Sequence, residues 1–143
     1  MITGTGHVAL RVSDVERSLR FYRDQLRLEE AFRLDRDGKL WLVYLKLPDG
    51  SFVELFPGYE GSFHLDEGKV GVAHFCLLVD DAAETAQELR SRGVETDEVR
   101  KGRSGCLQFF VADPDSHRIE LMQILPDSLQ GQHGAPIAQR RTV

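Results

Sequence analysis

The chain contains few residues that could cross-link it and no stretch that could hold it in a membrane. Only two cysteines, Cys76 and Cys106, occur among 143 residues. They form no CxxC motif, so we expect two reduced thiols, each packed as a small hydrophobic side chain inside a strand. No apolar run approaches the roughly 20 residues that a membrane-spanning helix needs. We therefore expect neither a disulfide-stabilised scaffold nor a membrane protein.

Positive charge is also scarce. The chain has 18 Lys and Arg residues against 23 Asp and Glu residues, which gives a formal net charge of −5 at pH 7. Broad binding to nucleic acid or to an acidic membrane surface needs a basic face, so we expect neither partner. Residues 1–4 lack the basic and apolar segments of a secretory signal. We expect a cytoplasmic protein that acts on a small molecule.

What the chain does contain is a repeated plan. Two sequence segments each occur twice in altered form. The first is GHVALRV at residues 6–12 and AHFCLLV at residues 73–79, and the second is PDGSFVEL at residues 48–55 and PDSHRIEL at residues 114–121. His74 follows His7 by 67 positions and Glu120 follows Glu54 by 66, so four residues of metal-ligand type keep their register. The sequence predicts one domain made of two similar modules. The expected division is module 1 at about 5–57, a connector at 58–70, module 2 at about 71–125 and a tail at 126–143.

Each module is predicted to run from a strand through a helix to three more strands. Ser13 and Glu16 have the spacing of a capping box, which predicts a helix from near Asp14, and Gly93 is placed to end the second helix. Trp41 is predicted to share one strand face with the apolar residues 43 and 45 and is interpreted as core packing. Later strands are expected at 28–34, 40–47, 52–56, 72–79, 94–99, 107–112 and 117–125, and the second helix at 81–92.

Strand alternation places the four repeated polar residues on faces that point away from the helices. His7 and Arg11 share one face of the first strand, while the apolar residues between them face the helix. The same alternation sets Glu54, His74 and Glu120 opposite helix-facing Val, Leu, Ile and Phe side chains. The tail carries no apolar pattern, and we expect it to be loosely held or to lie against a partner.

Two glutamates inside apolar strands are costly to bury unless a cation or a proton neutralises them. One divalent metal ion would neutralise the charges of both carboxylates. Two imidazoles and two carboxylates suit Zn, Ni, Co, Fe or Mn and leave coordination positions open for a substrate, which predicts catalysis. The other histidines lack the repeated register and are not assigned as ligands; they are His64, His117 and His133.

The repeated segments resemble sequence motifs of the vicinal oxygen chelate superfamily. Three further short segments contribute to this resemblance: Ser13-Asp14, Phe21-Tyr22 and Asp113-Pro114-Asp115. That superfamily includes glyoxalase I, methylmalonyl-CoA epimerase, extradiol dioxygenases, fosfomycin-resistance enzymes and bleomycin-resistance proteins. The resemblance covers about residues 5–125. It implies an α+β fold of two paired βαβββ modules whose curled sheets surround a metal-binding cavity. The modules of this superfamily pair either within one chain or across a dimer, and we expect a homodimer.

The resemblance also implies roles for single residues. It places His7, Glu54, His74 and Glu120 on the four metal-ligand positions used by glyoxalase I. In that enzyme the metal holds adjacent oxygens of a hemithioacetal, an enediolate forms, and a ligand glutamate moves the proton between carbons. This implies Glu120 as the catalytic base, with Glu54 as its counterpart. Arg11 matches an arginine that contacts a carboxylate of glutathione, which makes an anionic or thiol-conjugated substrate plausible.

One departure bears on the substrate. Where glyoxalase I carries an asparagine shortly after its first glutamate ligand, this chain has FPGY at residues 56–59. The amide that would contact glutathione is missing. Our first hypothesis is a metal-dependent lyase or isomerase of glyoxalase type acting on a small oxygenated substrate. The alternatives are a metal-dependent epimerase or dioxygenase of the same superfamily, and a ligand-binding protein of the bleomycin-resistance kind, which needs no catalytic metal.

Overall fold

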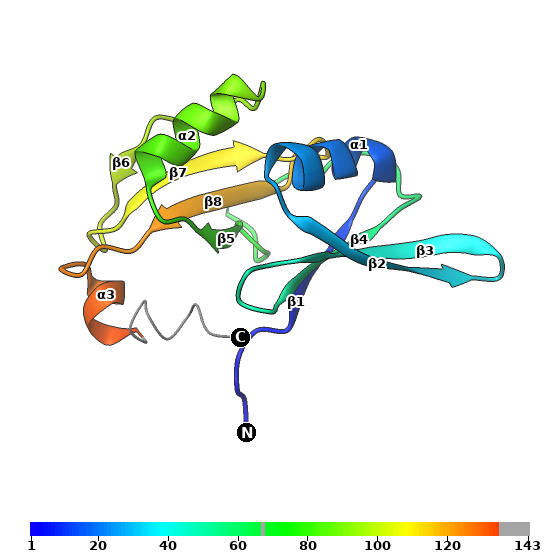
Figure 1. Ribbon diagram of the computed structural model, residues 1–143, viewed down its shortest axis with the longest axis horizontal. Coiled ribbons are helices and arrows are strands. Elements are labelled where there is room, and N and C mark those ends of the chain that lie inside the picture. Colours follow the sequence, from blue (N-terminus) through cyan, green and yellow to red (C-terminus); the bar gives the residue numbers. More distant parts are fainter. Residues whose placement is uncertain (67, 135–143) are drawn as a thin grey trace. The chain divides into compact units, whose positions relative to one another are not determined.

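The computed structural model describes residues 1–66 and 68–134 and has a mixed α+β fold (Figure 1). The chain divides into two compact units, and the boundary between Ser62 and Phe63 lies inside the expected connector. Each unit contains one four-stranded, unclosed sheet. Strand, helical segment and three strands follow one another in both units. The predicted fold class and the predicted βαβββ plan are therefore confirmed.

The first unit has the strand order β1-β4-β3-β2, with β1 parallel to β4 and the other neighbours antiparallel. Its elements are β1 (His7–Arg11), α1 (Val15–Leu19), the π-helical η1 (Arg20–Gln25), β2 (Glu29–Arg36), β3 (Lys39–Lys46) and β4 (Phe52–Phe56). Val53 and Leu55 of β4 are fully buried, and α1 contacts that strand. Burying each such side chain stabilises the fold by about 1.5–3 kcal/mol. The opposite face of the sheet carries the polar residues of interest.

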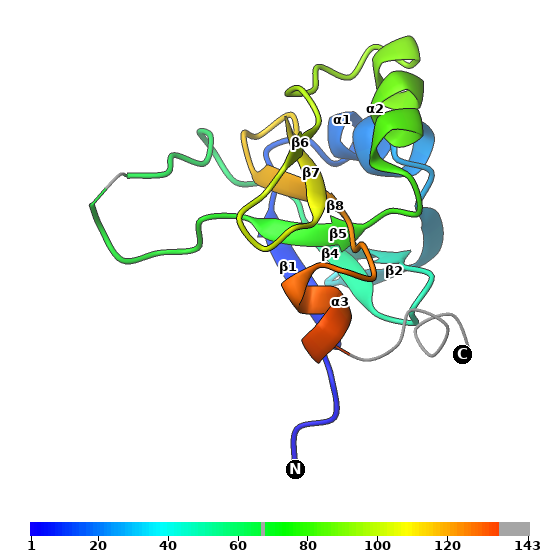
Figure 2. The ribbon, with the colours of Figure 1, turned by 90° about the vertical axis from the view of Figure 1, so that its left-hand side faces the viewer.

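The second unit repeats this plan with the strand order β5-β8-β7-β6. Its elements are β5 (Phe75–Leu78), α2 (Ala82–Ser91), β6 (Arg100–Lys101), β7 (Leu107–Ala112), β8 (Arg118–Gln123) and α3 (Leu129–His133). α2 contacts β7 and β8 and lies over one face of the sheet (Figure 2). Ile119 and Leu121 of β8 are buried. Among the described residues, no helix has both the length and the apolar character needed to cross a membrane.

The first helix begins where the sequence predicts, but a different side chain caps it. The Asp14 carboxylate accepts a hydrogen bond from the Arg17 backbone N–H at 2.9 Å, which makes Asp14 the N-cap. Ser13 Oγ instead accepts from the Arg17 guanidinium at 2.9 Å. Both residue types are favoured at this position, so the capping-box assignment was wrong by one residue. Gly93 follows the second helix with φ of 80°, as a C-terminal glycine should.

Two predicted strands of the second unit are wrong in extent. β5 is confined to Phe75–Leu78, so His74 lies immediately before it. Residues 94–99, all of them described, hold no strand, and β6 comprises Arg100–Lys101 alone. The reason is that Arg90 of α2 binds this segment, donating to Thr96 Oγ1 at 2.7 Å and to the Asp97 carbonyl at 3.0 Å. The Asp97 N–H also donates to the Phe110 carbonyl of β7 at 3.0 Å, so this segment contacts the sheet without extending β6.

Trp41 does not pack in the core as predicted. The register between β2 and β3 passes from Leu34 opposite Leu42 to Asp35 opposite Leu40, which leaves Trp41 at a bulge. Its side chain is 37% exposed. The ring lies 6.1 Å from the ring of Phe56, and the Arg36 guanidinium lies over it at 4.1 Å. The bulge reverses the alternation, so the predicted burial of Trp41 was wrong.

The beginning of the tail is ordered structure. Ser128 is 1% exposed and caps α3 by accepting a hydrogen bond from the Gly131 N–H at 3.0 Å. A Cβ at Gly131 would meet the Leu125 carbonyl oxygen, so only glycine fits this close approach. The expectation of a loosely held tail is therefore wrong for residues 128–134. Residues 135–143, to which the same expectation applied, lie outside the described residues.

A buried turn precedes β8. Asp113 Oδ1 accepts hydrogen bonds from the backbone N–H groups of Asp115 and His117 at 2.9 and 2.8 Å. Its Oδ2 lies 2.9 Å from His117 Nδ1, and the imidazole stacks on the ring of Phe63. The hydrogen bond to Asp113 raises the pKa of His117 above its usual value of 6.5. His117, which has no counterpart in the repeated register, is thus a structural residue.

This raised pKa predicts a pH-dependent contribution to stability. A histidine whose folded-state pKa exceeds its unfolded value stabilises the fold fully below about pH 6.5. The contribution is lost as pH rises through the folded-state pKa. We expect the difference in free energy of unfolding between the parent and His117→Gln to be larger at pH 5.5 than at pH 9, measured by urea denaturation. A difference that is the same at both pH values would contradict the linkage.

Candidate active site

The first pair of predicted ligands comes together on the sheet face away from α1. The parallel register sets Ala9 of β1 opposite Glu54 of β4, and His7 lies two residues earlier on the same face. His7 Nδ1 is 3.4 Å from Glu54 Oε1. Glu54 is 4% exposed. Its Oε1 is buried and makes no hydrogen bond to any residue that the structure describes.

Aromatic side chains surround this carboxylate. Tyr44 of β3 is the cross-strand partner of Glu54, and a hydrogen bond to Glu54 is the main reason that the pKa of Tyr44 is raised. The rings of Phe32 and Tyr44 stack with centroids 4.3 Å apart, and Phe52 meets Tyr44 edge-on at 5.6 Å. Sequence reasoning missed the contact of Tyr44 with Glu54, because cross-strand register cannot be read from one strand.

The second pair repeats the first in the other unit. Glu120 of β8 is 9% exposed, and its Oε2 lies 3.1 Å from His74 Nε2 in a hydrogen bond. The imidazole also meets the ring of Phe110 edge-on at 5.3 Å. Phe110 of β7 is the cross-strand partner of Glu120, in the place that Tyr44 has beside Glu54. The structure therefore brings His7 to Glu54 and His74 to Glu120.

The two pairs have the chemistry of metal ligands. Imidazole nitrogens and carboxylate oxygens both bind Zn, Ni, Co, Fe and Mn, and a buried carboxylate oxygen without a hydrogen-bond partner is an expected feature of a ligand. Within either unit, the described residues include no group of three or more His, Cys, Asp or Glu side chains that could hold a metal. Each unit on its own thus offers two donors. Each unit therefore supplies one histidine and one glutamate, which is half of the four ligands expected for one metal ion.

The cysteines differ from one another. Cys106 is fully buried, as predicted, whereas Cys76 is exposed on the same face as Glu120, its partner across β5 and β8. The prediction of a core side chain was therefore wrong for Cys76, because the alternation that puts His74 on this face puts residue 76 there as well. Loss of hydration within the fold, together with the Glu120 charge, raises the pKa of Cys76 to about 12.

Two arginines lie on the polar faces of the sheets. Arg11, the predicted substrate contact, is exposed at the end of β1, with its guanidinium 4.7 Å from the centre of the Tyr59 ring. Arg118 precedes Glu120 by two residues on β8 and lies over the Phe110 ring at 3.9 Å. Stacking on a ring leaves the edge of a guanidinium free to donate hydrogen bonds. Alternation alone would have found Arg118, but nothing in the sequence distinguished it from an ordinary surface arginine.

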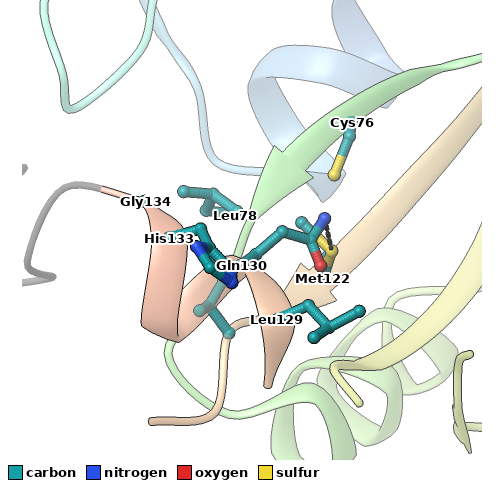
Figure 3. A pocket seen from close by; sticks show the side chains of 8 residues that line it. Cys76, Leu78, Met122, Leu129, Gln130, His133 and Gly134 are labelled. Carbon is teal, nitrogen blue, oxygen red and sulfur yellow. Dashed lines mark hydrogen bonds between the residues drawn. The ribbon is translucent and has the colours of Figure 1, made fainter. Parts of the chain in front are cut away.

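A groove of about 560 Å³ lies on the polar face of the second sheet, beside α3 (Figure 3). Leu78 of β5 and Met122 of β8 line it, and they are cross-strand partners. Gln130 of α3 lies over them, with its amide donating to Met122 Sδ at 3.6 Å and with Cys106 Sγ donating to its oxygen at 3.0 Å. The remaining lining residues are Cys76, Ile124, Leu129, His133 and Gly134.

Comparisons with known sequences identify the family of the chain. A sequence profile of the Glyoxalase/Bleomycin resistance protein/Dioxygenase superfamily matches residues 4–121. The chain is 32% identical over 125 residues to lactoylglutathione lyase of Haemophilus influenzae, across 82% of this chain and 90% of that protein. It is 30% identical over 132 residues to lactoylglutathione lyase of Escherichia coli O157:H7, across 82% and 90%.

Solved structures give the same picture of the fold. The glyoxalase family protein from Enterococcus faecalis superposes with a TM-score of 0.73 at 25% identity, covering 83% of this chain and 96% of that one. The protein SMU.1112c superposes with a TM-score of 0.76 at 27% identity, covering 85% and 99%.

Proposed function

Since this chain belongs to the glyoxalase/bleomycin resistance protein/dioxygenase superfamily, we propose that it is a metal-dependent lyase or isomerase of glyoxalase I type. The substrate is a small oxygenated molecule with two adjacent oxygens. One observation carries the proposal: Glu54 Oε1 is buried beside His7 without a hydrogen-bond partner among the described residues. The second unit repeats this histidine–glutamate arrangement with His74 and Glu120.

His7, Glu54, His74 and Glu120 are the proposed ligands of one divalent ion, which is Zn, Ni, Co, Fe or Mn. Two carboxylates and a divalent cation form a neutral set, so the ion removes the cost of burying Glu54 and Glu120. When bound, such an ion supplies Lewis-acid chemistry, which polarises neighbouring oxygens of a substrate. The pairing of His7 with Glu54 and of His74 with Glu120 supports the assignment.

Glu120 is the proposed catalytic base, and Glu54 is its counterpart. A carboxylate takes the proton from one substrate carbon and returns it to the adjacent carbon, so that no net proton is consumed. Glu120 is 9% exposed, and His74 Nε2 lies 3.1 Å from its Oε2 in a hydrogen bond. A carboxylate in such surroundings exchanges a proton with a substrate rather than with water.

Arg11 is the proposed substrate contact. Its ring contact with Tyr59 leaves the guanidinium edge free to bind a carboxylate of the substrate with two parallel hydrogen bonds. The relatives named lactoylglutathione lyase suggest a thiol-conjugated substrate for this chain too. The residues FPGY at 56–59 lack the asparagine expected for contact with glutathione, so several thiols belong in the search for the substrate.

A measurement of bound metal tests the proposal. We expect protein purified without added metal to hold close to one equivalent of a divalent transition metal per chain. We also expect added metal to raise the thermal midpoint, because an ion at about 100 times its dissociation constant adds roughly 2.7 kcal/mol of stability. Elemental analysis and calorimetry give the two readouts. Less than about a tenth of an equivalent, with no stabilisation on adding metal, would favour a ligand-binding protein of the bleomycin-resistance kind instead.

A further inference from the structure

Three different side chains follow one another along the polar face of β8. Arg118, Glu120 and Met122 are alternate residues of this strand, so their side chains point to the same face at steps of about 6.5 Å. Glu120, the proposed base, lies in the middle of this row. It therefore has a cation on one side and an apolar side chain on the other. Each of these two neighbours belongs to a larger feature of the second unit.

The cation is held beside the proposed base by an aromatic ring. The Arg118 guanidinium lies over the Phe110 ring at 3.9 Å, and Phe110 is the cross-strand partner of Glu120. The imidazole of His74, which is hydrogen-bonded to Glu120, meets the same ring edge-on at 5.3 Å. Arg118 forms no ion pair with any carboxylate of the described residues. A stacked guanidinium can bind a carboxylate through its edge with two parallel hydrogen bonds.

The apolar side chain on the other side of Glu120 belongs to the groove beside α3. Cys76, the cross-strand partner of Glu120, lines this groove, and so do Met122 and its partner Leu78 (Figure 3). Leu78 is 51% exposed, and Leu129 of α3, which also lines the groove, is 56% exposed. Exposed apolar side chains gathered around a hollow are typical of a binding surface. The volume of about 560 Å³ lies within the range of about 300–1,000 Å³ found for small-molecule sites.

We propose that the substrate is a carboxylic acid with an apolar substituent, and that it lies along β8 with its reacting carbons beside Glu120. Arg118 binds the carboxylate, and the groove takes the substituent. The inference rests on the proposed function and narrows its substrate class. Arg118 and Met122 are four residues apart, about 13 Å along the strand, so the substrate is an elongated molecule. A methyl group fills only a small part of the groove, and a chain of several carbons or a ring fits it better.

The two anchors contribute in different ways. A guanidinium paired with a carboxylate through two hydrogen bonds fixes orientation as well as adding affinity. The groove adds affinity by removing apolar surface from water, at about 4-fold for each fully buried methylene group. Because the anchors lie on opposite sides of Glu120, together they determine which carbon of the substrate faces the carboxylate of the base.

The test uses a compound that does not react, an N-hydroxy-N-alkylsuccinamic acid. Its carbonyl and N-hydroxyl oxygens are adjacent, as proposed for the substrate. Its carboxylate lies on one side of these oxygens, and its alkyl group lies on the other. Two comparisons are made: the carboxylate against the corresponding carboxamide, and the N-butyl compound against the N-methyl compound. Isothermal titration calorimetry gives the dissociation constants, both with Zn²⁺ added and without it.

We expect the parent protein to show two preferences. The carboxylate is expected to bind roughly 10- to 100-fold more tightly than the carboxamide, the usual range for a hydrogen bond to a charged group. The butyl compound is expected to bind roughly 10- to 60-fold more tightly than the methyl compound, because three more methylene groups are buried. Equal binding within either pair of compounds in the parent overturns the inference.

Arg118→Gln is expected to remove the preference for the carboxylate and to keep the preference for butyl. Arg92→Gln is the matched control, since it removes the same charge from the end of α2, where Arg92 pairs with Glu88 at 2.7 Å. The control is expected to keep both preferences within about 2-fold, as separate sites usually do. A folded Arg118→Gln that still prefers the carboxylate as the parent does contradicts the role of Arg118.

Leu78→Ser is expected to remove most of the preference for butyl and to keep the preference for the carboxylate. The matched control is Leu65→Ser, because Leu65 is a partly exposed leucine of the same unit that does not line the groove. Cooperative thermal unfolding checks that each variant folds. A folded Leu78→Ser with the full preference for butyl contradicts the role of the groove.

The outcomes separate this inference from the proposed function. If added Zn²⁺ tightens the binding of none of these compounds, the proposed metal site is wrong. The carboxylate and butyl preferences of the metal-free protein still test the two anchors in that case. If Zn²⁺ tightens binding but the parent lacks either preference, the metal site stands and the substrate class proposed from β8 is wrong.

Discussion

Replacement of Glu120 by glutamine is expected to lower kcat by about 10²- to 10⁴-fold, which is the usual contribution of a positioned general base. The amide has nearly the size and shape of the carboxylate, but it cannot accept a proton from a carbon acid. It keeps one oxygen that can still face a metal, so the variant is expected to fold and to retain part of its metal affinity. Steady-state kinetics with hemithioacetals made from several thiols, and with acyl-CoA epimers, gives the measurement.

Glu54→Gln is the matched control, because Glu54 holds the equivalent position in the first unit. We expect this variant to lose metal affinity more than Glu120→Gln does, and to recover much of its turnover when metal is supplied in excess. Full turnover in both variants would show that neither glutamate transfers the proton. A larger loss of kcat in Glu54→Gln at saturating metal would exchange the two roles.

The second large effect is expected when either histidine of the proposed ligand set is removed. His7→Ala and His74→Ala should each abolish retention of metal during dialysis, because one ion is proposed to need donors from both units. The loss of a direct ligand should exceed the roughly 10- to 100-fold that an outer partner costs. Elemental analysis after dialysis, with the parent treated in parallel, measures the number of ions retained per chain.

The count of ions distinguishes one shared ion from two separate ones. If each histidine–glutamate pair bound its own ion, each single variant would keep half of the metal held by the parent, and the double variant would keep none. If one ion needs both pairs, either single variant already loses all of it. His64→Ala serves as the control, since His64 lies between β4 and β5 and outside the repeated register. It is expected to retain the full count.

The fold, and the sheet face on which each candidate ligand lies, could be predicted from the sequence for a definite physical reason. Successive side chains of a strand point to opposite faces of the sheet. Because the two modules have similar sequences, the same alternating pattern appears twice in the chain. His7, Glu54, His74 and Glu120 could therefore be assigned to the polar faces, and the structure brings them into two pairs. Gly93, which ends the second helix, was also a correct local signal, whereas the first helix is capped by Asp14 and not by the predicted Ser13.

Features that depend on contacts between distant strands were not predictable in this way. The contact of Tyr44 with Glu54 depends on the register between β3 and β4, which a single strand does not encode. The segment before β6 is bound by Arg90 of α2, and α3 includes a close approach at Gly131. In each case the deciding partner lies on another element, and local propensity carries no information about it.

The bulge at Trp41 has a practical consequence. Trp41 is the chain's single tryptophan. The bulge turns it out of the core toward Phe56, which follows Glu54 by two residues on β4. A half-exposed indole has an emission spectrum that responds to changes in its hydration and in nearby charge. Intrinsic tryptophan fluorescence of the unlabelled protein therefore reports from a single place on the first sheet, beside Phe56. Metal and substrate titrations can be followed optically without adding a dye.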